Sequence, residues 1–245
     1  MAGMRHRFAV TAGQIREGRV TLTGPVARQI ARVLRLGPGD GILLFDEEGV
    51  EHAARLLRVA PSRVEAAVEG TSRPGRESPL RLTVAPALLR GPRMDLLVEK
   101  ATELGVTAVA PLLLRRCVAT GSGRLTRWRA IAREAAEQSG RTRLPAIEAP
   151  VPLATFLATL PAEAIRLALW EGEGGLPFRS LDGAVLRRQP AVLVVGPEGG
   201  LSPEEVGTLR EAGFTLLTLG PRILRAETAP LAALTLLQSL AGDLG

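Results

Sequence analysis

From residue 80 onward, short apolar runs alternate with segments whose apolar residues recur at helical spacing. The apolar runs predict strands over residues 80–89, 106–114, 164–170, 191–195 and 214–220. The helical spacing predicts helices over residues 92–104, 126–139, 203–212 and 231–242. Because these strands are apolar throughout rather than on alternate residues, they predict a mostly parallel sheet covered by helices on both faces.

Before residue 70 the pattern differs. Period-two alternation and β-branched residues predict strands, with a turn at Asp46–Gly49, over residues 18–24, 39–60 and 62–70. A helical period over residues 25–36 places four apolar residues on one face: Val26, Ile30, Val33 and Leu34. We expect a small β-barrel-like domain that carries one helix.

Residues 70–79 separate these two patterns. Their sequence, GTSRPGRESP, is rich in Gly, Pro, Ser and Arg and has no apolar anchor. We therefore predict an N-terminal domain over residues 1–71 and a larger α/β domain over residues 72–245.

A glycine-rich loop, GPEGG, follows the predicted strand 191–195. The next helix begins with a capping box, in which Ser202 is the N-cap, Pro203 follows it and Glu205 is the third helical residue. The loop therefore lies at the carboxyl end of a strand, where open α/β sheets bind their ligands. The alternative is a tight strand-to-helix turn with no ligand.

The loop does not match the common phosphate-binding motifs. A P-loop needs a lysine, and the chain's single lysine, Lys100, lies far from it. The spacing of GPEGGL also differs from the dinucleotide fingerprint G-x-G-x-x-G. Because Glu198 would repel a pyrophosphate, we expect a ligand that is neutral or cationic near this carboxylate.

A second polar loop lies between the predicted strand 214–220 and the last helix. Charged and hydroxyl side chains gather in it: Arg222, Arg225, Glu227 and Thr228. Two polar loops at neighbouring strand ends favour a composite pocket. The alternative is a structural loop in which Arg225 pairs with Glu227 and Thr228 caps the helix.

Composition narrows the functional classes. The formal net charge is +6 and almost all of the positive charge is arginine, which suits recognition of RNA phosphates but also fits a biased genome. Cys117 is the only cysteine, and His6 and His52 are the only histidines. These counts exclude an internal disulfide and a cysteine-based zinc site, and leave little material for a metal site. Without a long apolar run or a signal-peptide core, we expect a cytoplasmic protein.

Several segments together resemble one family. GPEGGLSPEE and LGPRILRAETA resemble the C-terminal signature of bacterial 16S ribosomal RNA uridine N3-methyltransferases in the SPOUT superfamily. RMDLLVEKATELGV, RCV and REAAEQSGRTRLP resemble the middle of that family, and RHRFAV and VARQIARVLRLGPGDGILLFD resemble its PUA-like domain. The chain departs from the family at Ala226, where a threonine is usual, which removes a hydroxyl group but no charge.

The resemblance implies a fold and an activity that periodicity does not. The C-terminal domain should be a SPOUT-type α/β domain with a deep trefoil knot, preceded by a smaller PUA-like β-barrel that binds RNA. The activity should be transfer of a methyl group from S-adenosylmethionine to N3 of a uridine in 16S ribosomal RNA, uridine 1498 in the family. The partners should be 16S ribosomal RNA or the 30S subunit and a second copy of the chain, with neither a metal nor a membrane.

The resemblance also implies a set of functional residues. The knot loops should bind the cofactor through Leu169, Trp170, Glu171, Gly172, Gly196, Pro197, Glu198, Gly199, Gly200, Leu219, Gly220, Arg222, Ile223, Leu224 and Thr228. Arg225 is our candidate for stabilising the uridine anion, and Glu227 or Glu198 for accepting its proton or orienting the arginine. Candidate RNA contacts are Arg5, Arg7, Arg28, Arg32, Arg115, Arg116, Arg141 and Arg143, although any one of these can instead be a solvated arginine.

Two other functions stay open at this point. The chain can be a SPOUT enzyme with another RNA target or atom, or an RNA-binding assembly factor whose loops have a structural role only.

Overall fold

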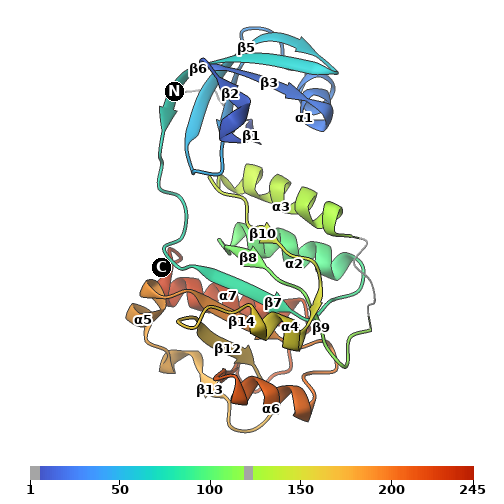
Figure 1. Cartoon of the computed structure of the whole chain (residues 1–245), viewed down its shortest axis with the longest axis vertical. Helices are drawn as coiled ribbons and strands as arrows, with labels where there is room; N and C mark the ends of the chain where they lie inside the picture. Colours follow the sequence, from blue (N-terminus) through green and yellow to red (C-terminus); the bar gives the residue numbers. More distant parts are fainter. Residues whose placement is uncertain (1–5, 119–123) are drawn as a thin grey trace. The chain divides into compact units, whose positions relative to one another are not determined.

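The computed structural model describes residues 6–118 and 124–245. The chain divides into two compact units (Figure 1). One comprises Met1–Glu77 with Ala136–Leu144, and the other comprises Ser78–Ala135 with Pro145–Gly245. The last residues of the helix α3 (Leu125–Ser139) are therefore assigned to the N-terminal unit.

The N-terminal unit is built on one six-stranded sheet. The strand order is β1-β4-β5-β6-β3-β2, and only β1 and β4 pair in parallel. The strands are β1 (Arg7–Ala9), β2 (Ile15–Arg16), β3 (Arg19–Thr23), β4 (Gly41–Phe45), β5 (Glu51–Ala60) and β6 (Arg63–Ser72). No pairing of β1 with β2 closes the sheet within the described residues, so it is a half-barrel. β6 extends into the predicted linker, because Gly70–Ser72 pair with β5.

Most of the apolar face predicted for the helix of this unit is confirmed, with one exception. It consists of α1 (Gly24–Arg28) and a π-helical turn, η2 (Gln29–Val33), preceded by the short 3-10 turn η1 (Ala12–Gln14). Ile30 is buried, but Val33 is 73% exposed. The wide turn, closed by a bond from Leu34 N to Gln29 O, shifts the register by one residue. The prediction that Val33 faces the core is therefore wrong.

The larger unit contains a seven-stranded sheet in which every pairing is parallel, as the apolar runs predict. In spatial order its strands are β10 (Ala146–Ile147), β8 (Ala108–Val109), β7 (Leu82–Pro86), β14 (Ala191–Val195), β12 (Ile165–Leu169), β15 (Thr215–Thr218) and β13 (Leu176–Pro177). The predicted strand 106–114 is two strands, because β9 (Leu112–Leu113) leaves this sheet after Pro111 and pairs with β11 (Val151–Pro152).

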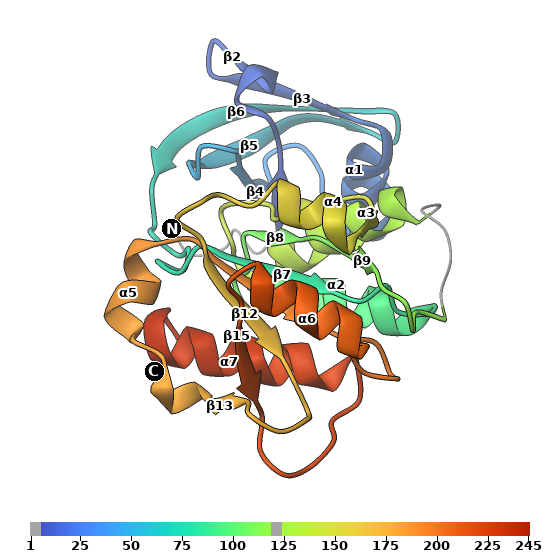
Figure 2. The same cartoon turned by 60° about the horizontal axis from the view of Figure 1, so that its bottom comes forward.

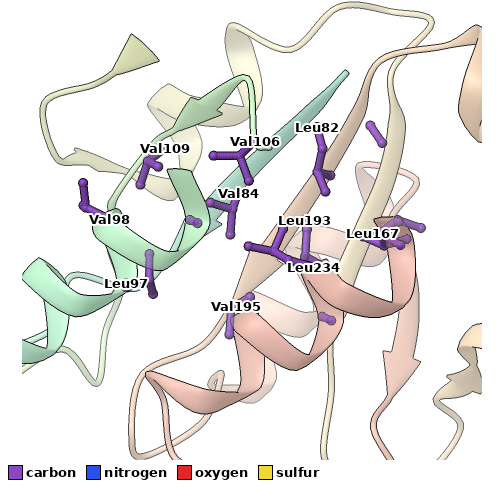
Figure 3. Close-up of a cluster of buried hydrophobic side chains, with 14 of the residues drawn as sticks. Leu82, Val84, Leu97, Val98, Val106, Val109, Leu167, Leu193, Val195 and Leu234 are labelled. Atoms are coloured by element: carbon purple, nitrogen blue, oxygen red, sulfur yellow. The ribbon is translucent and has the colours of Figure 1, made fainter. Parts of the chain in front are cut away.

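Helices cover both faces of this sheet (Figure 2). Residues of α2 (Pro92–Glu103), α5 (Gly183–Arg188) and α7 (Thr228–Ala241) belong to one apolar cluster with Leu82, Val84 and Leu193. Figure 3 shows Leu97 and Val98 of α2 and Leu234 of α7 beside these strands. Residues of α4 (Leu153–Ala158) and α6 (Pro203–Glu211) pack on the other face. The remaining helices are α3 (Leu125–Ser139) and the 3-10 turn η3 (Phe178–Ser180).

The strand order shows how the C-terminal segment passes through the fold. β12 and β13 are joined by residues 170–175, yet β15, formed later in the chain, lies between them and pairs with both. The chain then continues into α7, where the Ala241 carbonyl accepts a hydrogen bond from Arg187 of α5. A late strand inserted in the sheet between two strands that an earlier segment joins is the arrangement expected of the SPOUT-type knotted fold, an exception to the rule against threaded loops.

Within the part of the chain that the structure describes, no helix is long and apolar enough to cross a membrane.

Candidate active site

A cavity lies at the carboxyl ends of three neighbouring strands, β12, β14 and β15. Figure 2 shows the long connection from β15 to α7 that supplies one of its walls. The lining residues come from three loops and the strand ends: Leu169, Trp170, Glu171, Val195, Gly196, Pro197, Gly200, Leu201, Leu217, Thr218, Leu219, Gly220, Arg222, Ile223, Leu224, Ala226 and Ala229. The two polar loops singled out in the sequence therefore share one pocket.

Most of the predicted cofactor-binding residues line this cavity. Gly172, Glu198, Gly199 and Thr228 do not. Gly199 is exposed, and its carbonyl oxygen accepts a hydrogen bond from Nη1 of Arg116 at 2.6 Å. Whether the lining residues bind a cofactor stays a prediction.

A side chain would be unfavourable at two glycines of the GPEGG loop. Gly200 has φ +70°, and a Cβ atom there would overlap the carboxylate of Glu171. A Cβ atom at Gly196 would lie 3.0 Å from the backbone nitrogen of Leu201. Gly200 is favoured by its left-handed backbone conformation, and Gly196 by the close approach of the Leu201 backbone.

The helix that follows the loop begins as the sequence predicts. Ser202 Oγ accepts a hydrogen bond from Glu205 N at 3.3 Å, and Glu205 Oε2 accepts one from Ser202 N at 2.8 Å. Glu205 also accepts a bond from the backbone N–H of Arg115 at 2.7 Å. The capping box thus holds the loop at its C-terminal end.

Three charged residues meet beside the cavity. Arg93, the second residue of α2, donates from Nη1 to Oε1 of Glu198 at 2.7 Å. Its Nε lies 3.7 Å from Oε1 of Glu227. The two candidate proton acceptors are therefore joined through an arginine that sequence reasoning missed. The sequence gives no reason to single out Arg93, because a polar residue in the first turn of a helix is usually solvent-exposed.

Among the described residues, the second polar loop does not have the Arg225–Glu227 pair and the Thr228 cap that its structural alternative requires. α7 begins at Thr228 with Glu227 as the N-cap residue, so the interpretation of Thr228 as the cap is wrong. Arg225 is exposed, and no ion pair joins it to Glu227 within the described residues. Its carbonyl oxygen accepts bonds from the N–H groups of Thr228 and Ala229. The backbone closes this loop, which leaves the Arg225 guanidinium exposed.

The arginines proposed for RNA binding have different surroundings. Arg141 is buried, with Nη2 2.7 Å from Oε2 of Glu77, so its guanidinium is not a surface group. Arg7 is also largely buried, pairs with Glu51 and lies over the ring of Phe45. These two arginines support the N-terminal unit, and burial removes them as surface contacts for RNA.

The other candidates are exposed or partly engaged. Arg115 pairs with Glu204 at 2.9 Å, and Arg116 bonds to the GPEGG loop. Arg28, Arg32 and Arg143 are exposed. Arg5 lies outside the described residues. Of these, Arg28 and Arg32 share the helix α1–η2 and have no side-chain partner among the described residues.

Known proteins resemble both parts of the chain. Residues 76–238 match the family described as RNA methyltransferase domain, and residues 22–69 match the RNA methyltransferase PUA domain. Ribosomal RNA small subunit methyltransferase E of Synechocystis sp. is 37% identical over 97% of this chain and 78% of its own length. The protein of the same name from Bacillus subtilis is 31% identical over 94% of both chains.

Solved structures agree over the whole length. The methyltransferase E of Neisseria gonorrhoeae, bound to S-adenosyl methionine, superposes with a TM-score of 0.91 at 36% identity, covering 98% of this chain and 99% of that one. A Legionella pneumophila protein in complex with the same cofactor superposes with a TM-score of 0.89 at 32% identity, covering 97% of this chain and 98% of that one. The chain belongs to the family of the ribosomal RNA small subunit methyltransferases E.

Proposed function

We propose that this protein transfers a methyl group from S-adenosylmethionine to N3 of a uridine in the small-subunit ribosomal RNA, at the family's uridine 1498. One observation carries the proposal: the knot loops form a single cavity, with a cluster of Arg93, Glu198 and Glu227 beside it. The cavity suits the cofactor and the cluster suits removal of a proton. Family membership supports the methyltransferase activity.

The residues that line the cavity are suited to S-adenosylmethionine. Gly196 and Gly200 bring the backbone to its wall, and Leu201, Leu217 and Leu219 supply apolar surface for an adenosine. Glu171 also lines it, and a carboxylate there favours a ligand with a sulfonium and an ammonium group. When bound, the cofactor supplies a methyl group on a positively charged sulfur.

The residues of the second loop supply the chemistry at the uridine. N3 carries a proton that must leave before or as the new N–C bond forms, and the negative charge spreads onto the neighbouring carbonyl oxygens. The exposed guanidinium of Arg225 can donate to those oxygens as an oxyanion-stabilising group. Glu227 is our candidate for accepting the proton, because its Oε2 has no hydrogen-bond partner within the described residues.

The N-terminal unit suits recognition of RNA by its backbone. Arg28 and Arg32 project from one short helix and are exposed, as expected of groups that contact phosphates. The family resemblance supports 16S ribosomal RNA or the 30S subunit as the substrate and a homodimer as the active form. Since the substrate is ribosomal RNA, the site of action is the cytoplasm.

Nucleoside mass spectrometry tests this function. The purified protein is incubated with cofactor and with 30S subunits from a strain that lacks the corresponding gene. We expect N3-methyluridine to appear in the 16S ribosomal RNA. A different methylated nucleoside would reject the proposed atom, and no methylation by a folded, cofactor-binding protein would favour a non-catalytic assembly factor.

A further inference from the structure

Arg93 connects three segments that are distant in the sequence. It lies at the start of α2, Glu198 lies in the GPEGG loop, and Glu227 precedes α7. Its Nη1 is 2.7 Å from Glu198 and its Nε is 3.7 Å from Glu227. Two different nitrogens of one planar guanidinium thus face two carboxylates, whereas a lysine would face both with a single nitrogen.

The three residues differ in the elements that carry them. Met94, next to Arg93, and Leu97, about one turn further along α2, are buried in the core and anchor the start of the helix. Glu198 is in an exposed part of its loop, between the cavity-lining residues Pro197 and Gly200. The backbone of Arg93 is therefore anchored on a packed helix, whereas the two carboxylates belong to loops that its guanidinium connects.

The two oxygens of Glu227 have different surroundings. Its side chain is only 14% exposed, and Oε1 is the atom that faces Arg93. Oε2 is buried without a hydrogen-bond partner among the described residues. A buried carboxylate oxygen that lacks a partner is costly in a purely structural role, so Oε2 needs a hydrogen-bond partner that a bound substrate can supply.

We infer that Arg93 is a positioning residue for methyl transfer, which holds Glu227 by Oε1 so that Oε2 is free to take the uridine N3 proton. This inference rests on the proposed function. The N–H electron pair stays on N3 and forms the bond to the methyl carbon, while the pair of the sulfur–methyl bond returns to sulfur. The proton on Glu227 is afterwards released to water, so the step needs no further reactant.

A double-mutant cycle in single-turnover assays tests the inference. With cofactor and RNA both saturating, we expect Arg93→Ala to lower the rate about ten- to a hundredfold, which does not exceed the full contribution of a positioned base. Glu227→Gln should lower it at least as much, and the double variant should be no slower than Glu227→Gln alone. Arg90→Ala is the matched control, because Arg90 is exposed just before α2 and has no side-chain partner among the described residues. It should keep the wild-type rate.

Chemical rescue separates positioning from a general loss of structure. Arg93 is 46% exposed, so free guanidinium ion can enter the space left by Arg93→Ala. Millimolar guanidinium should restore part of the rate of Arg93→Ala but none of that of Glu227→Gln, and sodium chloride at equal concentration should restore neither. If Arg93→Ala melts at a lower temperature than the assay, Arg93→Gln takes its place in the cycle.

Several results would overturn the inference. An Arg93 variant with a near-normal rate, or effects of the two single variants that multiply in the double variant, would show that Arg93 does not act through Glu227. Both results assume a wild-type protein that makes N3-methyluridine. If the wild type makes none, the proposed function fails instead, so the two failures are distinguishable.

Discussion

Oε2 of Glu77 and Nη2 of Arg141 lie 2.7 Å apart and form an ion pair in the N-terminal unit, although 63 residues separate them in the chain. The other carboxylate oxygen accepts hydrogen bonds from the backbone N–H groups of Thr142 at 2.8 Å and Arg143 at 3.1 Å. Burial raises the pKa of Glu77, but the bonds from Arg141 and the backbone outweigh burial and hold the pKa below its ordinary value of 4.5.

This lowered pKa predicts that acid weakens the N-terminal unit. A carboxyl group whose pKa is lower in the folded state stabilises the fold above its unfolded pKa, and that stability is lost as the pH falls through the folded value. Glu77→Gln should therefore destabilise the protein at pH 7 by about 1.5–3 kcal/mol, the range for hydrogen bonds to charged groups. Calorimetric melting from pH 7 to pH 3 should show the difference from wild type shrinking below about pH 4.5. A difference that is constant with pH would contradict the prediction.

The cofactor prediction concerns Gly200. Gly200→Ala adds a Cβ atom at φ +70° that overlaps Glu171 at the cavity wall, so we expect cofactor affinity to fall about tenfold or more. Gly199→Ala is the matched control, because its Cβ atom would lie 3.4 Å from Arg116 Cδ and outside the cavity lining. Isothermal titration with S-adenosylmethionine measures both. Equal affinities in two folded variants would remove this loop from the cofactor site.

The RNA prediction concerns Arg28 and Arg32. Replacing both with glutamine should weaken RNA binding at low salt. The slope of log affinity against log salt should become shallower by roughly one to two, because each phosphate contact that is removed no longer releases a counterion. Cofactor affinity should not change. Arg58→Gln, an exposed arginine on β5, is the control for a general loss of charge. A salt slope equal to that of the wild type would mean that Arg28 and Arg32 are solvated.

The last prediction concerns Arg225. Arg225→Lys keeps the charge but loses the planar guanidinium with its paired donors. We therefore expect single-turnover methyl transfer to slow by about a hundredfold to a thousandfold. The melting temperature should stay close to that of the wild type, because no ion pair joins Arg225 to Glu227 in the described residues. Melting curves and rates are measured on the same preparations. A stable Arg225→Lys protein with normal turnover would remove Arg225 from the reaction.

The sequence by itself determined the parts of this protein that depend on local chemistry. Runs of apolar residues predicted the parallel strands, and Ser202 with Glu205 predicted the start of α6. The GPEGG loop was predicted to lie at a strand end that faces a ligand, and the structure places most of the loop in the cavity wall. These features follow from spacing within about ten residues, which a sequence displays directly.

Only the tertiary structure decided which distant charges meet. Arg141 reads as a surface arginine in the sequence, yet Glu77 holds it in the interior, and Arg93 reads as an ordinary first-turn residue until Glu198 and Glu227 are placed beside it. The exposure of Val33 also depended on a single wide helical turn that no period predicts. Long-range pairing depends on how strands and loops are ordered in space, and a one-dimensional pattern holds no record of that order.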